Sequence, residues 1–559
     1  MRIAQPSPKA AAGLVALAAA LVLVIGSFEI GRPGYSVDEE FTEFAVRGIR
    51  AHGLPILPSG LLYDRGLAYS YASVIASGRV VSLMCGALLV VLTFVVVRRH
   101  VAAPPAWLAA LLVATSVPFW ATATTARFYA PFLLLFLAAL GASGTVGALF
   151  ALAFLARLTH ELAFLLALVP LLTRSWRSLL ATVGGLLSAQ AVLFLLHAID
   201  PPSGETMVRQ FFLWQVVNLF ERPGDRQFGI AFVVMALGVL LMPKRKWLWT
   251  VSAVSVAAMI IAFSIARATN GAALSVELVM STLREGSRYP LDMLWHIART
   301  TPLTLALALF TLVLRAAGAG GEWRPAERAA HLLWIGWVAW FGVIESGITT
   351  NYLLLPMSFM LIAIAVDVDA LGRAKTRPYA YAAVALLVIG IALDQWRGEG
   401  SLRDRLDAAR PTIHIPGIEE IRDSLQPNAR VVCTDELGCM MLVGRIDRWL
   451  ALDDYVRERF LVRRSSEMMT GVYTGVPAVF RPGEVFSPNA DGTLPDRTIV
   501  VDIFKDYPIG NSRSWLPKAI EEDGLRVTPL LETPQARVLQ VSPPERVADS
   551  TVRKALVQP

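Results

Sequence analysis

Long apolar stretches separated by short polar segments dominate the first two thirds of the chain. Apolar stretches of roughly 14 to 22 residues recur from Leu14 to Leu393, and helices of about that length cross a hydrocarbon core of about 30 Å. The pattern predicts a polytopic α-helical membrane protein of about thirteen spans. These are expected at residues 11–28, 78–97, 106–122, 128–142, 145–158, 161–173, 178–197, 228–242, 247–265, 301–315, 330–345, 350–366 and 378–394.

Basic residues indicate the orientation of these spans. Arg and Lys gather in every second loop, at residues 98–100, 174–177, 243–246, 315–328 and 373–377. Because such loops stay in the cytoplasm, the alternation predicts a cytoplasmic N-terminus and a C-terminal segment outside the cytoplasm. Residues 1–27 resemble a signal peptide, but no clean small-residue cleavage site precedes Phe28, so we expect a first anchor instead.

The loops on the opposite side are longer and chemically richer. In the first of them, 29–77, the segment 39–51 carries Phe41, Phe44 and Ile49 at helical spacing, which predicts a helix lying in the membrane interface. The loops 198–227 and 266–300 also mix apolar and charged residues. We therefore expect the active surface on the non-cytoplasmic side.

The pattern changes at residue 395, and from there the chain is polar and has no stretch long enough to span a membrane. Helices are predicted at 417–425 and 515–523, and strands at 430–433, 498–504, 525–531 and 536–541. Alternating helices and strands favour a small α/β domain. The predicted organisation is therefore a membrane domain, 1–394, followed by an extracytoplasmic α/β domain, 395–559.

Composition and charge narrow the class of protein. The chain is 55% hydrophobic and 17% charged, and its mean hydropathy of +0.54 exceeds that of soluble globular proteins. The net charge of +7 comes from the short basic loops, which argues against a nucleic-acid surface. Of three cysteines, Cys433 and Cys439 leave room for one disulfide, and no zinc pattern is present.

Carboxylates follow directly after the first span. The sequence Ser36-Val-Asp38-Glu39-Glu40 lies at the start of the first outside loop. Adjacent carboxylates there could bind a divalent cation, or one could act as general base on an acceptor hydroxyl. The alternative is a solvated helix start, with Ser36 as N-cap and the acids complementing the helix dipole.

Several motifs, taken in order, resemble those of one enzyme superfamily. They are the acids after the first span and the segments 77–82, 126–129 and 158–161. Together they resemble the bacterial glycosyltransferases of the C-type membrane superfamily, in particular the protein mannosyltransferase-like and lipopolysaccharide-core group that includes the aminoarabinose transferase. The resemblance covers residues 30–200. It implies that Asp38 is the catalytic base or a metal-associated residue, with Glu39 as its neighbour.

The resemblance also implies residues that bind the lipid phosphate or the sugar. Relatives carry an aromatic-basic-proline motif near Tyr63 and Arg65, and this chain keeps the arginine but lacks the prolines. A guanidinium suits a phosphate. The remaining implied binding residues are Arg79, Arg127, Tyr129, His160 and Glu161.

Two of these positions have alternative interpretations. Arg127 at a span's end is costly in lipid and favours an anionic partner, or it extends toward the headgroups. Arg157, His160 and Glu161 lie where relatives carry a Thr-Lys pair, so His160 replaces the lysine. A His and a Glu so close together could also ligate a metal.

Further candidates lie in later loops. Glu205, Arg209, Gln210 and Trp214 could shape a sugar pocket, with interfacial anchoring as the alternative for Trp214. The segment 351–356 resembles an Arg-Tyr-Leu-Leu-Pro motif in which Asn351 replaces the arginine. Arg284 and Arg288 are the nearest substitutes in sequence.

The function implied is transfer of a sugar from a polyprenyl-phosphate donor to a hydroxyl of a cell-envelope glycan, lipid or protein, with inversion. It would take place on the periplasmic face of the bacterial inner membrane. No nucleotide is expected, since the chain has no Gly-rich phosphate loop, and a divalent metal is optional. The alternatives are a transporter or flippase of lipid-linked sugars, which predicts charges in mid-span, a sensory protein, and a hydrolase that uses water as acceptor.

Overall fold

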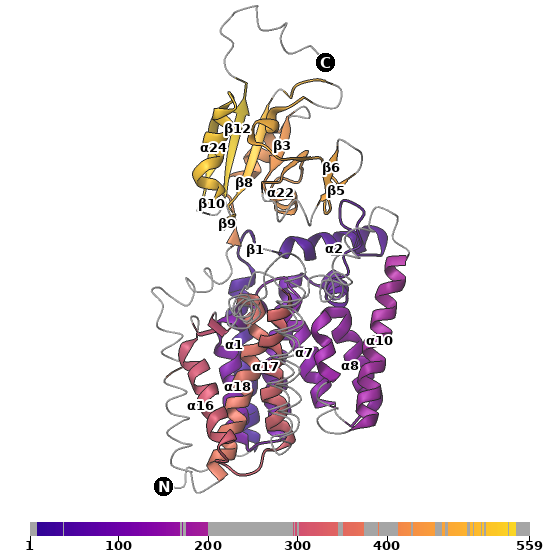
Figure 1. Cartoon of the computed structure of the whole chain (residues 1–559), viewed down its shortest axis with the longest axis vertical. Helices are drawn as coiled ribbons and strands as arrows, with labels where there is room; N and C mark the ends of the chain where they lie inside the picture. The colour runs from indigo at the N-terminus through magenta and orange to yellow at the C-terminus, as the bar shows by residue number, and fades with distance from the viewer. Residues whose placement is uncertain are drawn as a thin grey trace, which may run out of the picture. The chain divides into compact units, whose positions relative to one another are not determined.

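The computed structural model describes residues 8–36, 38–142, 144–167, 175–198, 301–344, 350–373 and, with short gaps, 412–543, together with a few isolated positions. The chain divides into two compact units (Figure 1). The first comprises residues 1–32, 64–200 and 208–410, and the second comprises 33–63, 201–207 and 411–559. The segment between the first two apolar stretches is thus shared between the two units.

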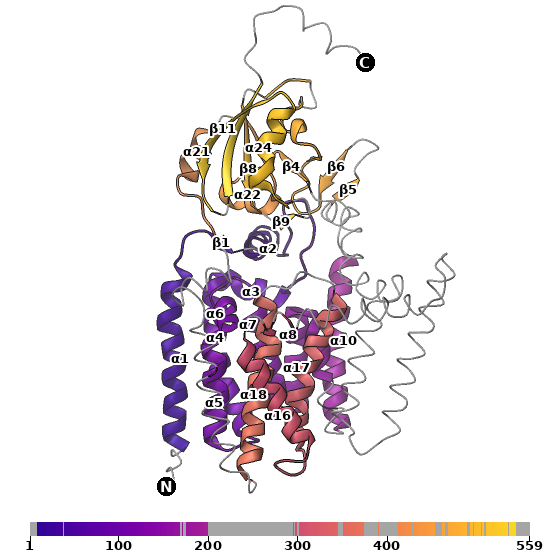
Figure 2. The same ribbon diagram turned by 60° about the vertical axis from the view of Figure 1, so that its left-hand side comes forward.

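The first unit is a bundle of apolar helices, most of which run alongside one another (Figure 2). Helix α4 packs against α1, α5 and α7, and α18 packs against α5, α16 and α17. The helices are α1 (Pro8–Ile30), α3 (Leu67–Ile75), α4 (Gly78–Arg98), α5 (Ala103–Thr115), α6 (Val117–Ala123), α7 (Tyr129–Gly141), α8 (Val146–Thr159), the 3-10 helix η1 (Glu161–Ala167), α10 (Trp176–Ala198), α16 (Pro302–Ala316), α17 (Pro325–Ile344) and α18 (Thr350–Arg373).

Four helices in the described part of the chain are long and apolar enough to cross a membrane. They are Ala12–Ile30, Gly78–Arg98, Trp176–Leu196 and Leu353–Gly372, and the bent pair α5 and α6 could form a fifth span. The spans predicted at 228–242 and 247–265, and nearly all of 378–394, lie outside the described residues. The count of about thirteen therefore stays a prediction.

The span predicted at 106–122 corresponds to the bent helix pair α5 and α6. The helix breaks at Ser116, whose backbone is extended at φ −75° and ψ 140°, and α5 and α6 meet at 63°. Pro118 lies in the first turn of α6, where it has no N–H to donate and its ring would clash with the preceding turn of a continuous helix. The Ser116 hydroxyl donates instead to the Val113 carbonyl at 2.9 Å.

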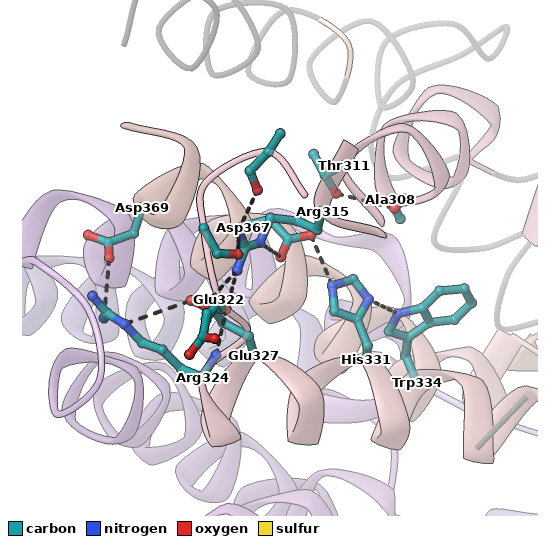
Figure 3. A network of polar contacts seen from close by, with 12 residues as sticks. Ala308, Thr311, Arg315, Glu322, Arg324, Glu327, His331, Trp334, Asp367 and Asp369 are labelled. Atoms are coloured by element: carbon teal, nitrogen blue, oxygen red, sulfur yellow. Dashed lines mark hydrogen bonds and ion pairs between the residues drawn. The ribbon is translucent and has the colours of Figure 1, made fainter. Parts of the chain in front are cut away.

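A buried polar network joins α16, α17 and α18 (Figure 3). The Arg315 guanidinium pairs with Glu327 at 2.5 Å and lies 3.8 Å from Asp367, and all three side chains are at most 1% exposed. His331 Nε2 lies 2.9 Å from the same aspartate, and Trp334 Nε1 donates to His331 Nδ1 at 3.1 Å. Because an indole N–H can only donate, the His331 proton belongs on Nε2, where it faces Asp367.

The connection predicted at 315–328 lies between the end of α16 at Ala316 and the start of α17 at Pro325, and its cytoplasmic side stays a prediction. Its first arginine is not a loop cation. Arg315 lies in the last turn of α16 and is fully buried. Arg324 continues the network, because its guanidinium donates to the His100 carbonyl at 2.9 Å and lies 3.8 Å from Asp369. Buried charges are costly unless they are paired, and these pairs fasten three helices together.

A six-stranded sheet forms the core of the second unit, in the order β11-β12-β8-β3-β4-β7. The strands β8, β3, β4 and β7 are parallel, and β11, β12 and β8 are antiparallel. The strands of this sheet are β3 (Arg430–Cys433), β4 (Arg448–Leu450), β7 (Ala478–Val479), β8 (Thr498–Ile503), β11 (Arg526–Glu532) and β12 (Ala536–Ser542). Every residue of β3 and β8 is buried, as expected for central strands.

Helices and short strands complete this unit. They are β1 (Tyr35–Ser36), α2 (Glu39–His52), β2 (Thr412–Ile413), α21 (Ile418–Ser424), α22 (Glu436–Leu442), β5 (Leu461–Arg463), β6 (Met469–Gly471), the 3-10 helix η4 (Pro482–Phe486), β9 (Asp506–Tyr507), β10 (Gly510–Asn511) and α24 (Ser512–Glu522). The two helices and four strands predicted for the C-terminal segment are each confirmed, within three residues at their ends. A disulfide joins Cys433 to Cys439.

The helix predicted at 39–51 is confirmed as α2, and its location at a membrane interface stays a prediction. Phe44, Ala45 and Ile49 are buried. Gly48 lies against the following loop so closely that a Cβ there would be 2.2 Å from the Ile56 carbonyl oxygen. Helix α2 also contacts β1 and α22, so it is packed within the second unit on more than one side.

Candidate functional site

Asp38 has an unusual backbone conformation. It lies between β1 and α2 with φ 75° and ψ −5°, and it is the one non-glycine residue with positive φ in the described part of the chain. The left-handed region costs an L-residue roughly 1–2 kcal/mol, which aspartate tolerates better than most. Strain of this kind concentrates at functional sites, where the surrounding structure holds it in place.

The carboxylates next to Asp38 are not those of a solvated helix start. Glu39 and Glu40 are each 4% exposed, and Glu39 Oε2 accepts a hydrogen bond from the Ser36 amide at 2.7 Å. The alternative with Ser36 as N-cap is wrong, because Asp38 occupies that position and makes no side-chain capping bond. The Glu39 carboxylate therefore closes a short loop, residues 36–39, that contains Asp38.

A second acidic pair, Asp435 and Glu436 of the C-terminal segment, belongs to the same unit as Asp38. Asp435 caps α22 by accepting from the Gly438 amide at 3.2 Å. Burial, followed by the charges of Asp435 and Glu40, raises the pKa of Tyr35 well above its usual value. The hydroxyl of Tyr35 is so close to α22 that a Cβ on Gly438 would lie 2.3 Å from it. The segment before Asp38 thus packs directly on α22.

Glu436 is a buried acid of this unit that no sequence pattern indicated. It is 3% exposed, and burial raises its pKa from 4.5 to about 7. Its Oε2 accepts from the amide of Thr474 at 3.2 Å and from the Thr474 hydroxyl. The sequence around Glu436 does not predict this burial, because the hydrogen-bond partner Thr474 lies 38 residues further along the chain.

Tyr63, predicted to contact the lipid phosphate or sugar, lies in the second unit. Its ring is stacked on Phe41, with centroids 5.4 Å apart and planes 15° apart, and Tyr473 meets Phe41 edge-on at 4.8 Å. Tyr63 is 7% exposed and its amide donates to the Pro55 carbonyl at 2.8 Å. The ring therefore packs α2 against the following loop.

Three predicted binding residues of the first unit come together. Arg127 is 3% exposed, and its guanidinium carbon lies 4.6 Å from the ring centre of Phe128 and 6.0 Å from that of Tyr129. The His160 ring lies 5.2 Å from Phe128 and 6.0 Å from Tyr129. A buried guanidinium flanked by aromatic rings is suited to an anion that enters from lipid.

The break at His160 positions its imidazole. His160 is extended between α8 and η1, and its Nδ1 accepts from the Leu162 amide at 3.2 Å, which leaves Nε2 as the donor nitrogen. The Arg157 side chain, from the same predicted motif, has other partners: it donates to Gln190 at 2.5 Å and lies over the Phe164 ring. The structure does not describe the side chain of Glu161.

Arg79 has a structural partner. Its guanidinium donates to the carbonyls of Ile30 at 3.3 Å and Arg32 at 2.8 Å, at the end of α1. A cation there complements the helix dipole and satisfies terminal carbonyls. The nearby Ser82 hydroxyl donates to the Arg127 carbonyl at 3.1 Å, so α4 holds the backbone of that arginine.

The remaining predicted residues are less informative. Arg65 is partly exposed in the first unit. Glu205, Arg209, Gln210, Trp214, Arg284 and Arg288 lie outside the described residues, and the side chain of Asn351 is not described. Among the side chains that are described, no group of three His, Cys, Asp or Glu could hold a metal ion.

Comparison with known proteins gives no family. No protein-family model matches the chain, and no curated protein matches it. A solved structure, the arabinosyltransferase EmbB from Mycobacterium smegmatis, is similar to it at 12% sequence identity and a TM-score of 0.28. The match covers 97% of this chain and 64% of that protein, so this chain spans less than two thirds of its length. Similarity at this level identifies neither fold nor activity.

Proposed function

We propose that the chain is a membrane glycosyltransferase that uses a polyprenyl-phosphate sugar and acts on the non-cytoplasmic face of the bacterial inner membrane. The observation that carries the proposal is Asp38, held in a left-handed conformation just past the first apolar helix and followed by two buried glutamates. The motif resemblance implies that this same residue is the catalytic base or a metal-associated residue, and we propose the first role. The acceptor is a hydroxyl of a cell-envelope glycan, lipid or protein.

The reaction is a single displacement at the anomeric carbon. Asp38 takes the proton of the acceptor hydroxyl, whose oxygen forms the new bond to the sugar. The bond between the anomeric carbon and the phosphate oxygen breaks, and the lipid phosphate leaves with the electron pair. Attack from the face opposite the leaving group inverts the configuration. Glu39 keeps the segment around Asp38 closed through its bond to Ser36.

Arg127 is the proposed partner of the lipid phosphate. It carries a fixed positive charge in a buried setting between aromatic rings, and charge-assisted hydrogen bonds to phosphate are strong there. Tyr129 and His160 line the same place, and His160 Nε2 adds a donor. A divalent metal stays optional in this proposal, and no step is assigned to one. No nucleotide is needed, because the phosphate linkage of the donor is already activated.

Turnover of defined donors tests the proposal. The protein in nanodiscs is incubated with a panel of polyprenyl-phosphate sugars, and release of polyprenyl phosphate is measured. Asp38→Asn should lower kcat by about 10²- to 10⁴-fold. Arg127→Gln should raise the donor KM by about 10- to 100-fold, the loss of a charged hydrogen bond. The matched control is Glu43→Gln in the same helix, where the carboxylate is exposed and pairs with Arg47.

Full activity of a folded Asp38→Asn protein would refute the proposal that Asp38 is the catalytic base. A wild-type protein that consumes no donor would favour the second candidate, a transporter or flippase of lipid-linked sugars. One observation supports that candidate, because the fully buried Asp367 lies within the apolar span Leu353–Gly372, where a transporter carries its charges. Movement of a fluorescent polyprenyl-phosphate sugar across proteoliposomes, without its consumption, would identify that function.

A further inference from the structure

The C-terminal segment holds the chain on both sides of Asp38. On the N-terminal side, β1 pairs with β2, so that Tyr35 lies opposite Ile413 and Ser36 opposite Thr412. The approach is close, because a Cβ on Gly34 would lie 2.4 Å from the Ile413 carbonyl oxygen. The backbone entering Asp38 is therefore set by a strand that arrives from more than three hundred residues later.

On the C-terminal side of Asp38, the contact is made by Tyr473. Its ring packs edge-on against Phe41, in the first turn of α2 and three residues after Asp38. The Tyr473 carbonyl also accepts from the Ser59 amide at 3.0 Å. One residue of the C-terminal segment thus contacts both α2 and the loop that follows it, and Tyr63 also stacks on Phe41.

Glu436 fixes the turn that carries Tyr473. Its carboxylate accepts from the Thr474 amide and hydroxyl, and a backbone hydrogen bond from Tyr473 also reaches it. A hydrogen bond from the Gly475 amide to the Gly471 carbonyl, at 2.9 Å, closes the turn. Gly471 leaves room for the carboxylate, because a Cβ there would be 2.2 Å from Glu436 Oε2. The turn is therefore built around this side chain.

Burying the Glu436 carboxylate costs free energy. Burial of a charged group must be offset by hydrogen bonds, and Glu436 Oε1 has no hydrogen-bond partner within the described structure. An apolar residue would cost less if the turn needed only to be buried. The hydrogen bonds that converge on this one carboxylate give the turn a defined orientation, and the Tyr473 ring transmits that orientation to α2.

We propose that Glu436 is a positioning residue for Asp38, and that it acts by placing Tyr473 against the first turn of α2. With the β1–β2 pair, this makes the C-terminal segment part of the catalytic geometry. The proposal rests on the proposed role of Asp38 as base. It assigns the segment a task in orienting the base toward the acceptor hydroxyl, and it assigns it no part in holding the donor.

Kinetics and hydrogen exchange together test this proposal. In nanodiscs, Glu436→Gln and Tyr473→Ala should each lower kcat for polyprenyl-phosphate release by about tenfold or more, with the donor KM unchanged within twofold, since misplaced catalytic groups cost rate. Tyr473→Phe keeps the ring and should restore kcat. In the same variants, amides of residues 34–42 should exchange faster with deuterium, while those of β8 and β12 keep their protection.

Glu484→Gln is the matched control. That carboxylate anchors a turn of the same unit in the same way, accepting from the Phe480 amide at 2.8 Å and the Arg481 amide at 3.3 Å. The 3-10 helix that contains it packs on β4, β7, β8 and α24. It should leave both kcat and the exchange of residues 34–42 unchanged.

Each contrary result has a definite meaning. Unchanged exchange at 34–42 in Tyr473→Ala would overturn the positioning contact. Faster exchange with unchanged kcat would overturn its link to Asp38. A tenfold change in donor KM rather than kcat would assign Tyr473 to the donor site and also overturn the proposal. Failure of the proposed function is seen separately, because the wild-type protein itself would then consume no donor.

Discussion

At the scale of single residues, the backbone of Asp38 can be tested apart from its carboxylate. Asp38→Gly and Asp38→Ala both remove the acid, so both should be equally inactive. They should differ in stability, because glycine adopts φ 75° without strain and alanine does not. We expect the glycine variant to be more stable by about 1 kcal/mol, measured by thermal unfolding in detergent. Equal unfolding temperatures would show that the left-handed conformation is not retained.

Glu436 predicts a pH dependence of stability at the same scale. Its pKa is raised from 4.5 to about 7 by burial, so the folded protein favours the neutral acid. Stability should therefore decrease with rising pH, because the contribution of Glu436 is complete below pH 4.5 and is lost as the pH rises through 7. The free energy of unfolding, measured by denaturant titration at each pH, should therefore fall between pH 5 and 8 more steeply in the wild type than in Glu436→Gln, by an amount on the order of a few kcal/mol. Parallel curves would contradict the shift.

At the scale of elements, the network between α16, α17 and α18 is a set of coupled pairs. Arg315→Met removes the buried guanidinium that lies between Glu327 and Asp367, which should destabilise the protein by about 3–5 kcal/mol. Arg315→Met combined with Glu327→Gln removes the closest pair together, so the double variant should lose less stability than the two single variants summed. Unfolding temperatures of the four proteins complete the cycle, and simple additivity would show that the pair is not coupled.

The elements themselves follow from local pattern where that pattern is strong. Helix α2 and strands β3, β8 and β12 lie where the hydrophobic period predicts them. The bend at Ser116 was not predicted, because apolar composition continues there while Pro118 breaks the hydrogen-bond ladder. The prediction failed at Arg315, where a basic residue at a span's end was taken as a loop cation and its acidic partners in other helices were not foreseen.

At the scale of the whole molecule, the position of a segment in the chain does not decide which unit it joins. Residues 33–63 follow the first apolar helix, yet they group with 411–559. The pairing of β1 with β2 and the packing of Tyr473 on Phe41 are the contacts that bring them together. The candidate base is thereby surrounded by residues from both ends of the chain, and the C-terminal segment becomes part of its setting.

The sequence by itself determined the membrane character and the order of most of the described helices and strands, because these depend on hydrophobic period and on neighbouring residues. Asp38 was singled out by the motif resemblance. The left-handed backbone of Asp38, the burial of Glu39 and the partners of Glu436 and Arg315 were decided only by the tertiary structure. These features need residues that are far apart in the chain to meet. Which of many polar groups meet depends on how all the elements pack together, and no local pattern encodes that.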